Sequence, residues 1–155
     1  GGNKVVDKLK IMHDSRLGTY GVLALIFSVT FRAALIAGMA SQILAVLALI
    51  CAGAVSRSLV ALAMNQLEMV RTKGLAAKAG QPTNESTLVT LALGGAIAFL
   101  LLGASGWIVI VVAFGAAVLM GLFAKRQIGG QTGDVLGTVQ QVAETAVLLS
   151  VVWVM

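Results

Sequence analysis

Long apolar segments constrain this chain more than any other feature of its sequence. A helix that crosses the hydrocarbon core of a bilayer needs about 20 predominantly apolar residues. Five segments meet that requirement: Thr19–Met39, Gln42–Met64, Thr87–Gly103, Trp107–Phe123 and Val135–Met155. Because an open sheet edge cannot lie in lipid, each segment has to be a helix. The sequence therefore predicts an all-α, polytopic membrane helical bundle of about five transmembrane helices.

The distribution of charge agrees with this class of protein. Only 11% of the 155 residues are charged, whereas soluble domains carry about 25%. The net charge of +5 would favour a nucleic-acid partner in a soluble protein, but here the basic residues flank alternate ends of the apolar segments. The basic residues outside the segments are Lys4, Lys8, Lys10, Arg16, Arg71, Lys73, Lys78, Lys125 and Arg126. The positive-inside rule then predicts a cytoplasmic N-terminus and an external C-terminus, and no nucleic-acid partner is expected.

We expect one transmembrane domain over residues 1–155. Within Lys4–His13, Val5, Leu9 and Met12 recur at helical spacing, which predicts an interfacial amphipathic helix before the first span. The segment of about residues 67–86 is the one substantial cytoplasmic loop. It is either a mobile cover over a site or a plain connector.

The most informative motif is the glycine-dense turn Ile128–Gly137, which lies between the last two apolar segments. Glycines let backbone N–H groups approach a ligand closely, and the N-terminus of the following helix favours anions. Asp134 at the start of that helix suits a hard metal ion, which usually accompanies phosphates. The turn therefore favours phosphate-ester chemistry at a membrane surface.

Three charged residues, Arg32, Arg57 and Glu144, lie inside predicted spans. Each is costly in hydrocarbon, so each should face the bundle interior, a watery cavity or a partner. A polar stripe also follows one face of the last span, with Asp134, Thr138, Gln141, Glu144 and Thr145 at intervals of three and four. Two interpretations remain open. Either Glu144 pairs with Arg57 or Arg32 and only fixes helix register, or these residues line a polar cleft that opens to the cytoplasm.

A second motif, Met12–Gly21, sets Asp14 and Arg16 among small residues before the first span. The whole pattern reads Asp-Ser-Arg-x-Gly-Thr-x-Gly, then Val55-Ser56-Arg57, then Gly-Gly-x-Thr-Gly-Asp-x-Leu-Gly, followed by Gln140, Gln141 and Glu144. This pattern resembles the cobalamin synthase family, the adenosylcobinamide-GDP ribazoletransferases. The resemblance runs from about Lys8 to the end of the chain.

The resemblance implies a multi-pass, Mg²⁺-dependent enzyme of the prokaryotic inner membrane. Its substrates would be adenosylcobinamide-GDP and α-ribazole or the 5′-phosphate of α-ribazole. A ribose hydroxyl would attack the phosphate attached to cobinamide, and GMP would leave. Phosphoryl transfer of this kind needs charge neutralisation by metal, positioned cations and a base for the hydroxyl, rather than a covalent nucleophile. The lipid bilayer is the other expected partner, and a homo-oligomer remains open.

The resemblance also assigns an expected role to individual residues. Asp14 and Asp134 are the expected metal ligands, and Glu144 joins them as an expected catalytic residue. The expected substrate contacts are Arg16, Arg57, Gly130, Thr132, Gly133 and Gln141.

One departure from the family concerns what precedes Gly1. Members carry an upstream motif of the form Asp-Gly-x-Ala-Asp-x-x-Asp-Gly, with further membrane helices before it, and this chain starts after that point. We therefore expect the chain to be a C-terminal portion of a longer enzyme and to be inactive in transfer when alone. His13 stands where the family usually has lysine or arginine, and it is expected to be a surface residue.

The alternative function is that of a small polytopic transporter or channel subunit. Arg32, Arg57 and Glu144 along a polar path would suit that function. It would not explain two motifs at the cytoplasmic surface. A purely structural membrane subunit would need no glycine-aspartate turn.

Overall fold

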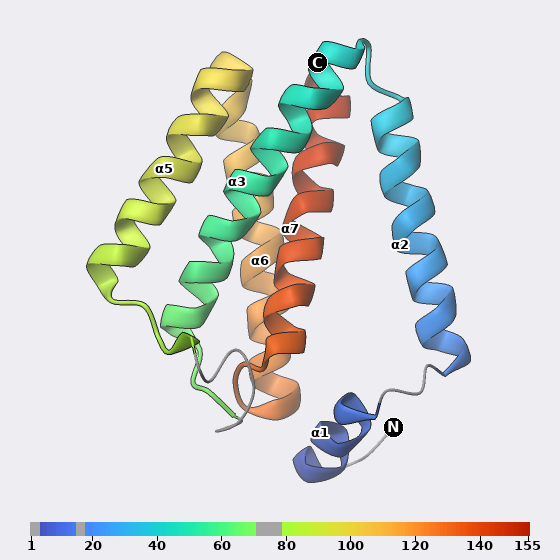
Figure 1. Cartoon of the computed structure of the whole chain (residues 1–155), viewed down its shortest axis with the longest axis vertical. Coiled ribbons are helices and arrows are strands. Elements are labelled where there is room, and N and C mark those ends of the chain that lie inside the picture. The colour runs from blue at the N-terminus through green and yellow to red at the C-terminus, as the bar shows by residue number, and fades with distance from the viewer. Residues whose placement is uncertain (1–3, 15–17, 71–78) are drawn as a thin grey trace.

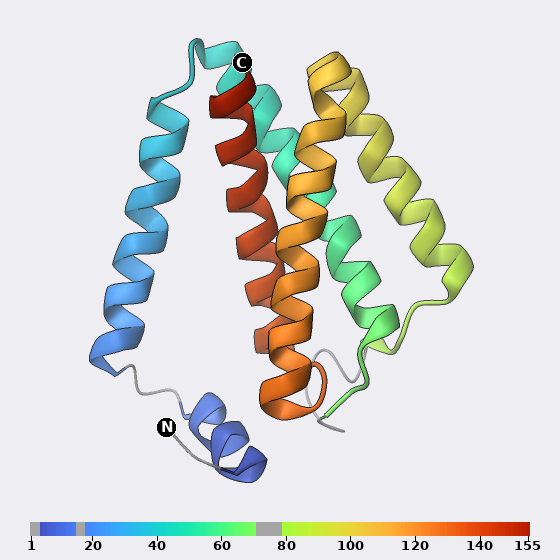
Figure 2. The same cartoon turned by 180° about the vertical axis from the view of Figure 1, so that it is seen from behind.

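The computed structural model describes residues 4–14, 18–70 and 79–155, and these form a bundle of helices (Figures 1 and 2). The long helices are α2 (Thr19–Ala37), α3 (Gln42–Gln66), α5 (Asn84–Leu102), α6 (Gly106–Ile128) and α7 (Gly133–Val154), and the short α1 (Val5–His13) precedes them. Four helical stretches are long and apolar enough to cross a membrane. The third, Asn84–Ile128, folds back at the 3-10 turn Gly103–Ser105 and so holds both α5 and α6. The predicted all-α polytopic bundle is confirmed.

Local capping moves some helix ends away from their predicted positions. α5 begins at Asn84 rather than Thr87, because the Thr83 hydroxyl accepts the Ser86 N–H at 3.1 Å and so caps the helix three residues earlier. α6 continues beyond the end of its apolar segment, through two basic residues, to Ile128. It ends only at Gly129, which takes the left-handed conformation with φ 86°.

The long helices alternate in direction, so the connections gather at two ends of the bundle (Figures 1 and 2). One end collects α1, the α3–α5 connection and the α6–α7 turn, and we call it the charged end. All the described charged side chains except Arg32, Arg57 and Glu144 belong to it. The other end collects the α2–α3 connection, the α5–α6 turn and the C-terminus.

The core lies among α3, α6 and α7, and α5 packs on the outer side of α3 (Figure 1). α7 is the central element, since 56% of its apolar window is buried, against 6% for α2. Along α2 only Leu35 is buried. α1 packs at the charged end, where Leu9 and Met12 contact the core and the Lys8 ammonium donates to the side chain of Gln127. Of the described long helices, α2 thus packs least against the bundle.

Candidate functional site

Two glycines of the α6–α7 turn are required by the fold. Gly129 has φ 86°, a conformation in which other residues are strained, and its N–H bonds the Lys125 carbonyl at 3.0 Å. Gly130 is buried against the backbone of Glu68, whose carbonyl oxygen leaves no room for a β-carbon. The turn therefore lies tightly on the segment that follows α3.

Gln131 fixes this contact. Its backbone N–H donates to the Glu68 carbonyl at 2.8 Å, and its carbonyl accepts the Val70 N–H at 3.1 Å. The side chain is 1% exposed, and its Nε2 donates to the carbonyls of Met64 at 3.0 Å and Leu67 at 2.8 Å. These carbonyls lie at the end of α3, where helical partners run out. Gln131 was not among the expected site residues, and in the structure it joins the turn to the end of α3.

Thr132 begins α7. Its backbone is extended, its hydroxyl accepts the Val135 N–H at 3.3 Å, and the residue is 2% exposed. This is the usual geometry of an N-cap. The structure thus gives Gly130 and Thr132 structural tasks, and their expected contact with phosphate stays a prediction.

The first turn of α7 is the open part of the motif. Gly133, Asp134 and Gly137 are exposed, and a β-carbon at Gly133 or Gly137 would meet nothing within 4 Å. Packing therefore does not require glycine at these two positions. The absence of a side chain at Gly133 leaves the backbone accessible at the helix N-terminus, where N–H groups and the helix dipole favour an anion.

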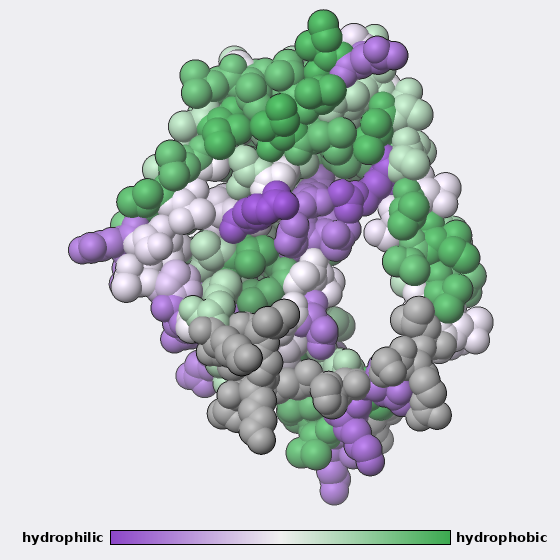
Figure 3. Space-filling model, in the orientation of Figure 1, coloured by the Kyte–Doolittle hydropathy of each residue, from purple (hydrophilic) through white to green (hydrophobic). Residues whose placement is uncertain are grey.

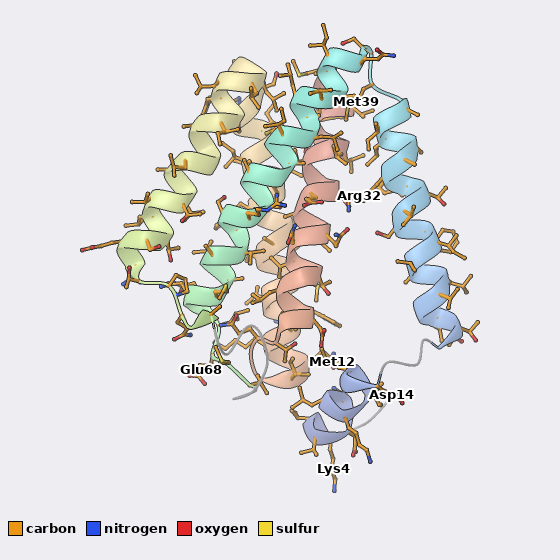
Figure 4. All side chains as sticks on the ribbon, in the orientation of Figure 1. Lys4, Met12, Asp14, Arg32, Met39 and Glu68 are labelled. Atoms are coloured by element: carbon orange, nitrogen blue, oxygen red, sulfur yellow. The ribbon has the colours of Figure 1, made fainter. Side chains whose placement is uncertain are left out.

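Asp14 lies at the same end of the bundle as Asp134. Asp14 directly follows α1 and is exposed, whereas Asp134 belongs to the first turn of α7 (Figures 1 and 4). The described parts of the two sequence motifs therefore lie at the same end of the molecule. Arg16, the expected phosphate contact between them, lies outside the described residues.

The described part of the chain holds no group of three histidine, cysteine or carboxylate side chains that could enclose a metal ion. Mg²⁺ usually keeps several waters and is held through one or two carboxylates together with substrate phosphates. Asp14 and Asp134 are exposed carboxylates at the charged end, and their service as Mg²⁺ ligands stays a prediction.

A second polar group lies deeper, on the same face of α7 and about 15 Å from its first turn. Glu144 is 8% exposed, and its carboxylate accepts from Arg32 Nη2 at 2.6 Å, Gln140 Nε2 at 3.0 Å and Ser56 Oγ at 3.3 Å. Arg32 Nη1 donates to Gln141 Oε1. Side chains from α2, α3 and α7 thus meet on one carboxylate near mid-span.

Arg32, rather than Arg57, is the ion-pair partner of Glu144. This outcome agrees with the interpretation in which Glu144 fixes the arrangement of the helices. Arg32 was absent from the expected site residues, although its position inside an apolar span was a signal, because a charge in hydrocarbon needs a partner.

Arg57 is exposed at mid-span on α3, and its Nη1 donates to the Gly53 carbonyl of its own helix at 2.9 Å. A backbone carbonyl does not neutralise a guanidinium. With Arg32 paired to Glu144, the charged residues within the described spans carry one positive charge in excess, that of Arg57. The surroundings of Arg57 therefore favour an anionic group.

The hydrophilic side chains at this level form an area that crosses α3 and α7 between two hydrophobic zones (Figure 3). A hollow of about 310 Å³ lies between α2, α6 and α7, and its walls include Ser28, Ala116, Gln141, Thr145 and Leu149. The expected site residues therefore fall into two sets. Asp14, Gly130, Thr132, Gly133 and Asp134 lie at the charged end, whereas Arg57, Gln141 and Glu144 lie deeper in the bundle.

Comparison with known proteins gives consistent matches. The sequence profile described as cobalamin-5-phosphate synthase matches residues 1–152. A Bradyrhizobium diazoefficiens protein is 40% identical over 150 residues, which cover 96% of this chain and 58% of that protein. A Mesorhizobium japonicum protein is 42% identical over 156 residues, with 96% and 58% covered, and an Azorhizobium caulinodans protein is 40% identical over 158 residues, with 97% and 60% covered. All three are named adenosylcobinamide-GDP ribazoletransferase. The chain thus spans under two thirds of their length, and no solved structure matches it significantly.

Proposed function

This chain belongs to the cobalamin-5-phosphate synthase family, and on that premise we propose that the protein is an adenosylcobinamide-GDP ribazoletransferase. In the proposed reaction a hydroxyl oxygen of the ribose of α-ribazole, or of its 5′-phosphate, bonds to the phosphorus that carries cobinamide. The phosphoanhydride bond to the guanylyl group breaks, and GMP leaves. Family membership favours this enzyme over the transporter or channel subunit.

The observation that carries the proposal is the open first turn of α7 at the charged end. Packing does not require glycine at Gly133 in this turn or at Gly137 in the next, and Asp134 is exposed between them. A diphosphate would bind the N–H groups of this turn, because a helix N-terminus favours anions. The carboxylate of Asp134 would act as a metal ligand or as the base that accepts the proton of the attacking hydroxyl.

Mg²⁺ is the proposed cofactor, with Asp14 and Asp134 as its protein ligands. When bound, it would neutralise negative charge on the diphosphate. Arg16 precedes α2 in the same motif as Asp14 and is proposed as a phosphate contact on sequence grounds.

Arg57, Gln141 and Glu144 are proposed to form the deeper part of the pocket. A substrate that contacts both levels has to extend about 15 Å along α7, as its rise per residue requires. Arg57 supports the proposal because its guanidinium is exposed at mid-span and has only a carbonyl of its own helix as a described partner. A negatively charged part of the substrate would neutralise it.

The charged end is proposed to face the cytoplasm, with the N-terminus on that side. This orientation follows from the positive-inside rule, because the described basic residues other than Arg32 and Arg57 belong to that end. The nucleotide substrate would then be bound from the cytoplasm at the inner membrane.

The test is a transfer assay on the protein expressed from its whole reading frame and reconstituted in lipid nanodiscs. We expect Asp134→Asn to insert normally and to lose transfer of α-ribazole to adenosylcobinamide-GDP, measured as GMP released. Ser86→Ala, on an exposed turn of α5 at the same end, is the matched control and should keep turnover. Normal turnover by Asp134→Asn would remove Asp134 from the mechanism.

A further inference from the structure

Close packing holds α2 only near its C-terminal end, where Leu35 lies in the core and Ile36 packs against it. Leu35 is the buried residue of α2, and the hollow of about 310 Å³ separates α2 from α6 and α7 at the level of Ser28 and Gln141. Figure 3 shows an opening through the molecule between α2 and the bundle, below the hydrophilic area. Towards the charged end, another interaction has to hold α2 in place.

Arg32 makes that interaction. It lies between α2 and α7 (Figure 4), and its two terminal nitrogens donate to Glu144 and Gln141, which are neighbours three residues apart on one face of α7. A guanidinium presents its donors in a fixed planar fork, so two contacts define an orientation as well as a distance. The long arginine side chain bridges α2 and α7, which contact each other much less than α7 contacts α3 and α6. We call this contact the Arg32 clasp.

The clasp joins the two helices that carry the two sequence motifs. α2 begins at Thr19, soon after Asp14, and α7 begins at Gly133, next to Asp134. Both helices start at the charged end (Figure 1). Arg32 lies about 20 Å from the start of α2 by helix rise, so the separation set at the clasp is transmitted to both first turns along rigid helices.

We infer that Arg32 is a positioning residue. By clasping Glu144 and Gln141 it sets the separation between the first turns of α2 and α7. It thereby sets the distance between Thr19–Gly21, the part of the first motif that belongs to α2, and the start of α7 with Gly133 and Asp134. The separation is a property of the fold, whereas its consequence for turnover rests on the proposed function.

The separation is measured with spin labels at Val22→Cys on α2 and Thr138→Cys on α7, in a Cys51→Ala background. Val22 and Thr138 are exposed near the charged end, and Cys51 is buried elsewhere in the core. Double electron–electron resonance in nanodiscs should give one narrow distance distribution for the otherwise unchanged protein and for Thr30→Val, a matched control on α2. We expect Arg32→Ala to broaden the distribution and shift it to longer distances.

The consequence for turnover is measured as a kcat-against-KM split. We expect Arg32→Ala to lower kcat by a factor on the order of 100, because small misplacements of reacting groups cost about that much, while KM changes little. Arg32→Lys keeps the charge and one of the two contacts, so it should recover part of both the narrow distribution and kcat. It also carries the test if Arg32→Ala does not insert.

An unchanged α2–α7 distance distribution in Arg32→Ala would overturn the inference. A changed distance with an unchanged kcat would overturn the positioning role. Absence of transfer by the unmodified protein would count against the proposed function alone, and the distance measurement would then decide whether the clasp holds the helices.

Discussion

Gly130 packs so closely against Glu68 that a β-carbon at position 130 would overlap the carbonyl oxygen of Glu68 and come within 3.0 Å of a methyl group of Val70. The obstacle is backbone, which cannot move aside as a flexible side chain can. We expect Gly130→Ala to lower the free energy of unfolding by about 1–3 kcal/mol, the usual cost of overpacking. Thermal unfolding of the purified protein in detergent measures the effect.

Gly137→Ala is the matched control for this substitution. Gly137 is helical and exposed, and a β-carbon there would meet nothing within 4 Å. Alanine in a helix interior is more favourable than glycine by about 0.5–1 kcal/mol. The two substitutions should therefore move the melting temperature in opposite directions. Equal effects would show that contact with Glu68 does not limit position 130.

Gln131→Leu should destabilise the protein through the end of α3. The substitution removes the two bonds from Nε2 to the carbonyls of Met64 and Leu67 and leaves them without that donor in a buried region. The expected loss is about 1–3 kcal/mol. Chemical denaturation followed by circular dichroism gives the change in unfolding free energy.

The control for this substitution is Gln66→Leu. Gln66 is exposed, and its amide bonds to the side chain of the adjacent Asn65. An exposed bond of this kind contributes little, so the expected change is within about 0.5 kcal/mol. A comparable loss in both variants would argue against a special role of the buried amide.

The ion pair of Arg32 and Glu144 should show strong coupling in a double-mutant cycle. Arg32→Met or Glu144→Met alone leaves one charge without its ionic partner at mid-span; the loss is about 3–5 kcal/mol for a fully buried pair and should be smaller for this partly buried one. Replacing both residues with methionine removes both charges and should cost less than the sum of the single substitutions. Additive losses, measured by unfolding in detergent, would contradict this coupling.

The orientation of the chain is tested by labelling single cysteines in the Cys51→Ala background. Ala104 is exposed at the α5–α6 turn, and Glu85 is exposed at the charged end. A membrane-impermeant maleimide applied to intact cells should label Ala104→Cys and spare Glu85→Cys until the membrane is opened. The reverse pattern would place the charged end outside.

Much of the fold could be predicted because helix formation in a membrane depends mainly on the local sequence. The five apolar segments have the length of a bilayer, and every backbone group in lipid needs a partner within its own helix. α2 and α3 begin at the predicted residues, Thr19 and Gln42. The predicted helix ends at Thr87 and Phe123 were wrong by a few residues. A threonine cap and a left-handed glycine, rather than hydrophobicity, set the ends at Asn84 and Ile128.

Less of the candidate site could be predicted from the sequence. Asp134 and Gly133 could be singled out because a carboxylate and glycines at a helix start have a local signature. Nothing in the local sequence distinguishes Gly130, which packing requires, from Gly133, which it does not. The partner of Glu144 was also open between Arg32 and Arg57, because both lie inside spans and the choice depends on how the helices pack.

The sequence by itself determined that the chain is a membrane helical bundle, with its charge at one end and its two motifs on that end. Those properties follow from composition, from the spacing of apolar residues, and from the number of spans, because the chain returns to the same side of the membrane after every second crossing. Only the tertiary structure decided that the glycine turn rests on the end of α3, and that Arg32 connects a loosely packed α2 to α7. Such contacts join residues far apart in the chain, and their partners are chosen by the shape and distance of helices already packed together.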